Sequence, residues 1–405
     1  MAPEPVTLDD IVAARALLAG VVRCTPLEHS RVLSERVDSD VYLKCENLQR
    51  AGSFKIRGAY TRMARLTTEE QARGVVAASA GNHAQGVALA AQLLGLRSTV
   101  FMPLGAATPK LVATRGYGAT VELVGTSVDE ALVHARAFAL ATGAVLIHPF
   151  DHTDVVAGQG TAGLEILEQC PDVRTVLVSA GGGGLLAGIA TAVKAVRPDV
   201  CVIGVQAEQA AAYPPSLAAG KPVALEAMST IADGIAVGCP GEVPYAVVRE
   251  LVDGIETVSE EALSRALLFL LERAKLVVEP AGAASVARLL DVRTGAYDGP
   301  VVAVLSGGNI DPLLLLRIIR HGMAAAGRYL QFRLRIPDQP GSLAALLRDL
   351  AEAGANVLEI EHVRTGATLH IDEVEVALQL ETKGPSHCEA VLTTLRRKGY
   401  PLTFS

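Results

Sequence analysis

The sequence contains no tryptophan, and aromatic residues make up only 4% of its 405 residues. Proteins that bind nucleic acids use basic surfaces and aromatic side chains that stack on bases. A formal net charge of −7 and the shortage of aromatic residues therefore argue against a nucleic-acid partner.

The six cysteines are scattered, and none of them forms a Cys-x-x-Cys pair. We therefore expect no metal cluster and no disulfide framework, but free thiols in a reducing compartment. The N-terminus lacks the basic and apolar regions of a signal peptide. Residues 75–96 carry no formal charge, but Asn82 and His83 within them would be costly in lipid, so this stretch is interpreted as a buried strand, loop and helix. The expected location is the cytoplasm, with no membrane partner.

Half of the residues are hydrophobic, and short β-branched runs alternate with helical stretches along most of the chain. This alternation is typical of an α/β fold in which helices wrap a parallel sheet. The expected strands are 41–44, 75–78, 99–101, 120–123, 175–179, 201–206 and 301–305, and the expected helices include 8–18, 85–94, 128–142, 185–196 and 260–274. Small-residue loops follow three strands, at 78–81, 180–184 and 306–308, and should face one ligand site at the carboxyl ends of the strands.

The pattern changes after residue 322. Residues 322–327 are mostly small, and 323–327 are expected to be a linker. The segment that follows, 328–405, predicts strand, helix, two strands, helix and a final strand, the βαββαβ order of a ferredoxin-like domain. Because it carries no nucleophile or acid–base motif, its expected role is binding or assembly.

The glycine run at residues 181–184 lies between an expected strand and an expected helix. There it can aim successive N–H groups at one anion beside the positive helix start. A tight turn would need fewer glycines, and each additional glycine costs about 0.5–1 kcal/mol, so we favour a phosphate site. The run Gly182-x-Gly184-x-x-Ala187 also fits a loose dinucleotide fingerprint, which leaves a nicotinamide-dependent oxidoreductase open.

Three further loops carry reactive or polar groups. Lys55 lies between Phe54 and Ile56, where an apolar pocket would lower its pKa and suit Schiff-base chemistry, although most lysines at helix starts are solvated. The loop 79–86 could receive a carboxylate on backbone N–H groups or could simply cap a helix, and a single histidine such as His83 is more often structural than catalytic. Ser306 places a neutral hydroxyl on the loop 306–308, which follows the expected strand 301–305.

Taken in order, these loops form a specific set: Ser53-Phe54-Lys55-Ile56-Arg57-Gly58-Ala59, Ser79-Ala80-Gly81-Asn82-His83-Ala84-Gln85, Gly181-Gly182-Gly183-Gly184-Leu185 and Ser306-Gly307-Gly308-Asn309. The set resembles the pyridoxal-phosphate-dependent threonine/serine dehydratases. That resemblance implies a tryptophan-synthase-β-like catalytic domain (fold type II) over residues 1–322, with two parallel-sheet subdomains, the smaller inserted at about 52–149. It also implies an ACT-type domain over residues 328–405.

The resemblance implies a role for each matching residue. Lys55 would bind the pyridoxal phosphate covalently and then take the Cα proton of the substrate. The cofactor phosphate would lie on the backbone of Gly181, Gly182, Gly183, Gly184 and Leu185. Asn82 would bind the ring 3-oxygen, Ser306 the ring nitrogen, and Phe54 would pack on one face of the ring with the loop 232–235 near the other. The substrate carboxylate would be received by Ser79, Ala80, Gly81 and His83.

The implied reaction is the β-elimination of L-threonine to 2-oxobutanoate and ammonia, with L-serine as a secondary substrate, in isoleucine biosynthesis or threonine catabolism. A neutral Ser306 at the ring nitrogen makes the ring a weaker electron sink than a carboxylate would, which favours elimination over transamination. Ala80 replaces the second serine of serine racemases, so racemisation is disfavoured. Glu279 lies at a position that resembles one in the family, but it also directly precedes Pro280, and the helix-start interpretation is favoured.

Alternatives remain at this point. They are a serine-preferring dehydratase, the nicotinamide-dependent oxidoreductase and a ligand-binding regulator without activity. Divalent-metal-binding relatives carry an acidic pair where this chain has Gln206, Ala210 and Ala212, so no metal site is expected, although the nearby Glu208 leaves some room for one.

The ACT-type domain implies a homo-oligomer, a dimer or tetramer, and an amino-acid effector such as isoleucine or valine. The effector would lie between the turn that contains Asp338 and Gly341 and the side chain of Asn356. The turn supplies N–H groups at a helix start for a carboxylate, and Asn356 could accept a hydrogen bond from an ammonium. Assembly without regulation is the simpler alternative.

Overall fold

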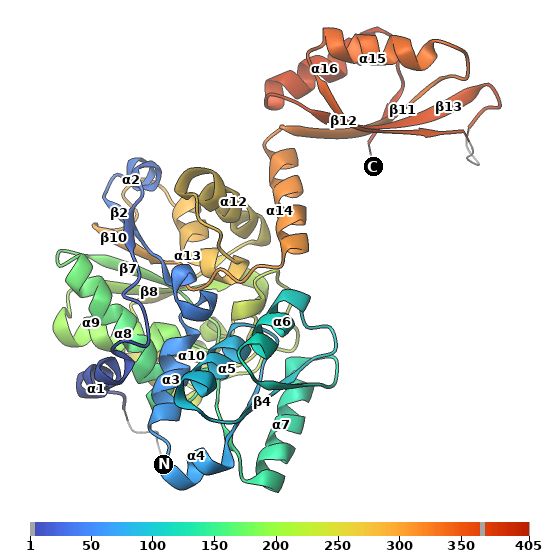
Figure 1. Ribbon diagram of the computed structural model, residues 1–405. Coiled ribbons are helices and arrows are strands. Elements are labelled where there is room, and N and C mark those ends of the chain that lie inside the picture. Colours follow the sequence, from blue (N-terminus) through green and yellow to red (C-terminus); the bar gives the residue numbers. More distant parts are fainter. Residues whose placement is uncertain (1–4, 365–368, 405) are drawn as a thin grey trace. The chain divides into compact units, whose positions relative to one another are not determined.

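The computed structural model describes residues 5–364 and 369–404 (Figure 1). The chain divides into two compact units, Met1–Pro312 and Leu313–Ser405. None of the helices in the described part of the chain has the length and apolar character that a bilayer span requires. Within the same residues, no group of three or more His, Cys, Asp or Glu side chains is arranged to hold a metal, and all six cysteines are free.

The first unit contains a six-stranded sheet in the order β1-β2-β10-β7-β8-β9. Its strands are β1 (Leu27–His29), β2 (Val41–Lys44), β7 (Thr175–Ser179), β8 (Cys201–Ala207), β9 (Gly254–Val258) and β10 (Val301–Val304). All neighbouring strands are parallel except β1 and β2. The helices α8 (Thr153–Gln169) and α9 (Gly184–Val196) lie against this sheet, and their apolar residues belong to its core (Figure 1).

A second, four-stranded sheet of the first unit has the order β5-β4-β3-β6 and is parallel throughout. Its strands are β3 (Val75–Ala78), β4 (Ser98–Met102), β5 (Thr120–Leu123) and β6 (Val145–Leu146). All four lie between β2 and β7 in the chain, so this sheet is inserted into the larger one. The two parallel-sheet subdomains predicted from the sequence are therefore confirmed.

A buried ion network joins the two subdomains beneath helix α3 (Lys55–Ala64). Arg57 donates to both oxygens of Glu46 at 2.8 Å and to Glu165 on α8 at 2.7 Å. Lys44 donates to the other oxygen of Glu165 at 2.6 Å. A buried pair of this kind contributes little net stability but is costly to break, so it fixes where α3, and with it Lys55, begins.

Helix α14 (Pro312–Ala325) belongs to the second unit from Leu313 onward, and residues 323–325 of the expected linker form its end. Then follow β11 (Tyr329–Pro337), α15 (Ser342–Glu352), β12 (Asn356–Val363), β13 (Glu373–Glu381), α16 (Pro385–Arg397) and β14 (Leu402–Thr403). The four strands pair antiparallel in the order β12-β13-β11-β14. Alternate residues such as Phe332 and Leu334 pack against Leu346 and Leu395 of the two helices. This is the βαββαβ arrangement predicted from the sequence.

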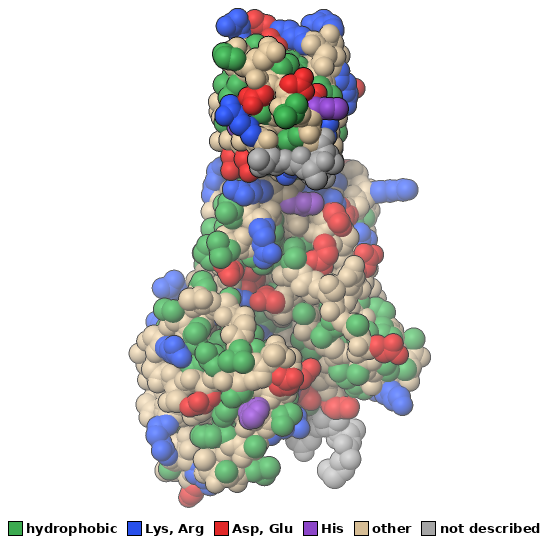
Figure 2. Space-filling model, turned by 90° about the vertical axis from the view of Figure 1, so that its right-hand side faces the viewer, with side chains coloured by type: hydrophobic (Ala, Val, Ile, Leu, Met, Phe, Trp, Pro, Cys, Tyr) green, Lys and Arg blue, Asp and Glu red, His purple; other side chains and the backbone are tan. Residues whose placement is uncertain are grey.

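Acidic and basic side chains are interspersed on the face shown in Figure 2, with hydrophobic side chains between them. Most expected elements match the observed ones closely. The helix expected at 85–94 begins earlier, at Asn82, with Gly81 as its N-cap residue. The helix expected at 260–274 is α12 (Glu260–Phe269), followed by one wider turn over Leu270–Ala274.

Candidate active site

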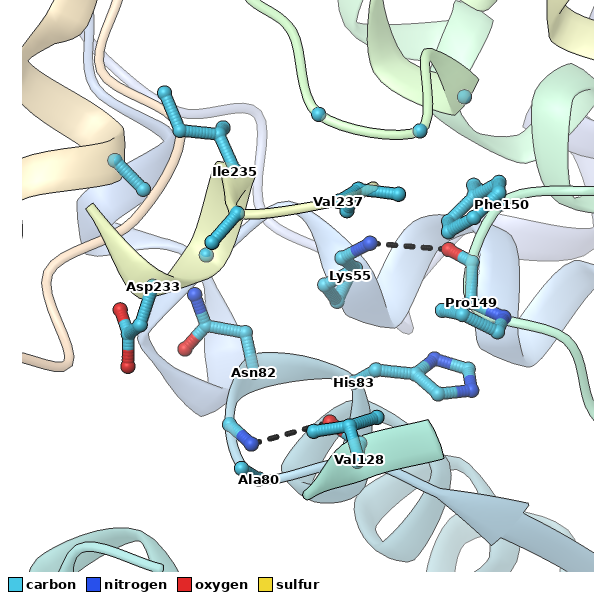
Figure 3. A pocket seen from close by; sticks show the side chains of 18 of the residues that line it. Lys55, Ala80, Asn82, His83, Val128, Pro149, Phe150, Asp233, Ile235 and Val237 are labelled. Carbon is cyan, nitrogen blue, oxygen red and sulfur yellow. Dashed lines mark hydrogen bonds between the residues drawn. The ribbon is translucent and has the colours of Figure 1, made fainter. Parts of the chain in front are cut away.

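A cavity of about 490 Å³ opens at the carboxyl ends of β3 and β7 and beside the loop that follows β10. All four loops singled out in the sequence contribute to its lining: Phe54 and Lys55, Ser79 to His83, Gly181 to Leu185, and Ser306. The structure thus brings every expected cofactor and substrate residue to one place. Figure 3 shows Lys55, Asn82 and His83 among them. Further lining residues come from segments that the sequence did not single out, among them Lys110 and His148 to Phe150, and Glu279 also lines the cavity.

The glycine loop between β7 and α9 is closely packed. Gly183 has a φ of +97°, and a Cβ there would overlap the hydroxyl oxygen of Tyr213. A Cβ at Gly182 would lie 2.5 Å from the ring of Phe150. A side chain of the neighbouring strand β8 anchors the start of the loop, because Gln206 donates to the carbonyl of Ala180 at 3.2 Å. Since α9 begins at Gly184, its first N–H groups have no acceptor within the helix and can bind an anion.

Lys55 is the first residue of α3, and its Nζ donates to the carbonyl of Pro149 at 3.0 Å (Figure 3). The amine also lies 5.0 Å from the centre of the Phe54 ring. Burial lowers the pKa of Lys55 to about 8, although the carboxylate of Glu279 acts in the opposite direction. A substantial share of this amine is therefore neutral near physiological pH, and it can act as a nucleophile or as a base.

His83 lies in the same cavity but is held away from acid–base chemistry. Its Nε2 lies 2.8 Å from the carbonyl oxygen of Ile147, to which the neutral ring donates. Burial, reinforced by the charge of Lys55, lowers the pKa of His83 to about 3. The ring is therefore neutral, and the structural interpretation of this histidine is favoured over a general base.

Asn82 is oriented by two side chains. Its Nδ2 donates to Oε1 of Glu279, and its Oδ1 accepts from Asn309 at 2.8 Å. These two contacts fix which way the amide faces and leave one N–H of Asn82 for a ligand in the cavity. Ser306 is buried beside them, with its hydroxyl 3.5 Å from the carbonyl oxygen of Ala281.

Glu279, for which the sequence favoured the role of a helix start, lines the site. It does precede helix α13 (Pro280–Asp291), but its side chain makes no capping hydrogen bond and instead lies in the cavity. The residue is only 1% exposed, and among the described residues Oε2 has no hydrogen-bond partner. Burial raises the pKa of Glu279 to about 7, against the opposing effect of Lys110. Its place before Pro280 hid this role, because a glutamate at that position is common at helix starts.

Lys110 and Asp233 form an ion pair at the cavity that has no local sequence signature. Lys110 belongs to α6 (Thr108–Gly116) of the smaller subdomain, and Asp233 belongs to a short turn over Asp233–Ile235 of the larger one. Their charged atoms lie 2.7 Å apart, and Oε2 of Glu279 lies 3.9 Å from the lysine. Burial disfavours the charge of Lys110, but Glu279 and Asp233 outweigh it and raise its pKa.

A separate pocket of about 430 Å³ lies in the second unit. It is lined by residues 336–343, which include Asp338 and Gly341, and by His362 and Arg364. Asn356 lies outside this lining and donates instead to Glu381 at 3.2 Å. Arg364, which the sequence did not suggest, donates to Asp338 at 3.2 Å. Of the three expected effector residues, Asp338 and Gly341 therefore lie in one pocket, and Arg364 lines it where Asn356 was expected.

Similarity to known proteins agrees with this geometry. Residues 18–307 match the family described as pyridoxal-phosphate dependent enzymes. The chain is 47% identical over 395 residues to an L-threonine ammonia-lyase of Thermotoga maritima, and the match covers 98% of each chain. It is 45% identical to the threonine deaminase in a crystal structure from T.th., with a TM-score of 0.71 over 75% of this chain and 99% of that one. It is 34% identical to maize serine racemase, with a TM-score of 0.74 over 80% and 99%. The family match spans most of the chain and includes both Lys55 and the glycine loop, so the protein belongs to the pyridoxal-phosphate dependent enzyme family.

Proposed function

We propose that this protein is a threonine ammonia-lyase, which converts L-threonine to 2-oxobutanoate and ammonia and accepts L-serine as a secondary substrate. The observation that carries the proposal is the single cavity in which the glycine loop, Lys55, Asn82 and the start of α5 (Asn82–Leu94) meet. The 47% identity to an L-threonine ammonia-lyase over nearly the whole chain supports the choice of reaction.

The residues of the cavity fit pyridoxal phosphate. The N–H groups at the start of α9 offer an anion site that suits the phosphate. A side chain at Gly182 or Gly183 would collide with Phe150 or Tyr213 and displace the loop that carries these groups. Lys55 supplies the amine, Asn82 a donor for the ring oxygen, and Ser306 a neutral hydroxyl for the ring nitrogen. Bound pyridoxal phosphate supplies an electron sink for the negative charge that develops at Cα.

Side chains of the protein decide where protons are taken up and given. The amine of Lys55, with a pKa of about 8, is neutral often enough to take the proton from Cα of the substrate. Glu279 keeps the amide of Asn82 aimed at the cavity. Ala80 has no proton to give to the opposite face of Cα, which favours elimination over racemisation even though the fold resembles that of a serine racemase.

The substrate carboxylate is placed at the start of α5. The backbone N–H groups of Ala80, Asn82 and His83 lie at the positive end of this helix. The N–H of Ser79 donates to the carbonyl of Phe101 at 3.0 Å, and the hydroxyl of Ser79 accepts from the N–H of Gly81 at 3.1 Å, which shapes the turn. The neutral ring of His83 supports the loop through Ile147 and is not a base.

For the second unit we propose an amino-acid effector, isoleucine or valine, in the pocket beside Asp338 and Gly341. The N–H groups at the start of α15, together with the guanidinium of Arg364, suit a carboxylate. The outer strand β12 has a free edge within the described sheet, which suits pairing with a second copy in a dimer or tetramer.

One experiment separates this function from the oxidoreductase alternative. The purified protein should carry a yellow chromophore, and borohydride reduction should fix it to the peptide that contains Lys55, as seen by mass spectrometry. The same protein should release ammonia and 2-oxobutanoate from L-threonine. A colourless protein that retains a nicotinamide nucleotide, or one that releases no ammonia, would refute the proposal. A higher kcat/KM for L-serine than for L-threonine would favour the serine-preferring dehydratase.

A further inference from the structure

Lys110 is a buried cation at the substrate end of the cavity. Its side chain is only 6% exposed, whereas that of its partner Asp233 is 58% exposed. Glu279 lies further away, at 3.9 Å. An ammonium so deeply buried requires anionic partners, and the closest of them is a side chain that solvent can reach.

The ammonium lies directly against the loop that is proposed to receive the substrate carboxylate. A Cβ built on Gly81 would lie 3.4 Å from Nζ of Lys110. The loop itself, Ser79 to His83, contains no charged side chain, and the depressed pKa of His83 keeps that ring neutral. Among the described residues that line the cavity, the lysines are Lys55 and Lys110, and Lys55 is engaged in the chemistry at Cα.

We propose that Lys110 binds the α-carboxylate of the amino acid held on the Ser79–His83 loop. When the substrate enters, the ammonium of Lys110 gives up its ion pair with Asp233 and pairs with this carboxylate. This inference rests on the proposed function and adds to it the group that selects substrates with a free carboxylate. In the absence of substrate, Asp233 neutralises the lysine. Because Asp233 is exposed, it can turn into solvent at little cost when the carboxylate enters. The raised pKa of Lys110 keeps it charged across the neutral range.

The test compares an acid with its amide. Steady-state KM values are measured on the holoenzyme for L-threonine and for L-threoninamide, which lacks the carboxylate charge. Lys110→Gln should raise KM for L-threonine roughly 10- to 100-fold, the loss of one charge-assisted hydrogen bond, and change KM for the amide less than about twofold. Lys110→Arg should restore most of the affinity for the acid. Arg115→Gln, which removes an exposed charge from the same helix, is the matched control and should behave as the parent.

A binding measurement that needs no turnover accompanies the kinetics. L-Alanine has no β-hydroxyl to eliminate, so its titration against the cofactor absorbance of each variant reports binding alone. Lys110→Gln should weaken the apparent affinity for L-alanine by the same factor as for L-threonine and leave that for L-alaninamide unchanged. Lys110→Met, whose apolar chain suits a buried position, serves if the glutamine variant does not fold.

Three outcomes would overturn the inference. Equal losses for acid and amide would show that Lys110 only holds the subdomains together. The same conclusion follows if Asp233→Asn, which removes the competing anion, raises KM for L-threonine as much as Lys110→Gln does. KM values for L-threonine that equal those of the parent in both Lys110→Gln and Lys110→Met would show that the ammonium makes no contact with substrate. A parent enzyme that does not deaminate L-threonine would instead refute the proposed function, so the two failures are distinguishable.

Discussion

Asn82 donates a hydrogen bond from its side-chain amide to Glu279, a carboxyl group that is almost wholly buried. The two residues come from different subdomains, since Asn82 begins α5 beside the smaller sheet and Glu279 directly precedes α13 beside the larger one. The contact therefore ties the orientation of a proposed cofactor ligand to the relative placement of the two subdomains. It also places a titratable group with a pKa of about 7 inside the site.

Replacing Glu279 should change how stability depends on pH. Burial raises the pKa of Glu279 from 4.5 to about 7, so the folded protein binds this proton more tightly than the unfolded chain does. The resulting stabilisation is fully present below pH 4.5 and is lost as the pH rises through 7. Glu279→Gln should remove this loss, which amounts to at most about 3 kcal/mol.

The measurement is the midpoint of thermal unfolding at pH 5 and pH 8. The parent should lose more stability between these values than Glu279→Gln does. Glu69→Gln, which changes an exposed carboxyl in α4 (Thr68–Arg73), is the control and should follow the parent. Parallel pH profiles of parent and Glu279→Gln would contradict the raised pKa.

Lys55→Ala should leave the fold intact and abolish turnover. The residue supplies both the amine for the cofactor and the base for the Cα proton, and loss of the base alone costs roughly 10²–10⁴-fold. The lysine lies at a helix start with one hydrogen bond to Pro149, so its removal breaks no ion pair of the α3 network. Release of 2-oxobutanoate is the assay, and circular dichroism checks the fold. Deamination within tenfold of the parent would remove Lys55 from both roles.

Gly183→Ala should weaken binding of pyridoxal phosphate. The positive φ strains an alanine, and its Cβ would meet the hydroxyl of Tyr213. Gly220→Ala is the matched control, because Gly220 also has a positive φ, +71°, but a Cβ there has no atom within 4 Å. Adding Tyr213→Phe should recover part of the affinity in the Gly183 variant only. Cofactor titration of the apoenzyme gives the comparison, and equal effects at the two glycines would argue against a close-packed phosphate site.

The sequence predicted those parts of the site that are encoded in adjacent residues. The glycine loop and Lys55 lie within short motifs at strand or helix ends, where backbone geometry and function depend on the same few residues. The family resemblance placed the loop 232–235, which contains Asp233, near the cofactor ring, but Lys110 and its pairing with Asp233 could not be found from local motifs. The two residues are 123 positions apart, Lys110 looks like an ordinary surface charge in its own segment, and only the packing of the two subdomains brings the charged atoms to 2.7 Å. Likewise, the hydrogen bond from Lys55 to the carbonyl of Pro149 could not be predicted from residue types, because every residue has a backbone carbonyl.

The effector proposal predicts different consequences for two polar residues of the second unit. Isoleucine or valine should shift the apparent affinity for L-threonine at least several-fold, since coupling free energies are typically about 1–3 kcal/mol. Arg364→Ala should abolish this shift, because the guanidinium lines the pocket and contacts Asp338. Asn356→Ala should retain it, because Asn356 lies outside the lining and pairs with Glu381. L-Threonine saturation curves with and without each effector, on the full chain, decide the matter. If neither amino acid shifts the parent curve, or if Asn356→Ala loses the shift while Arg364→Ala keeps it, the pocket beside Gly341 is not the regulatory site.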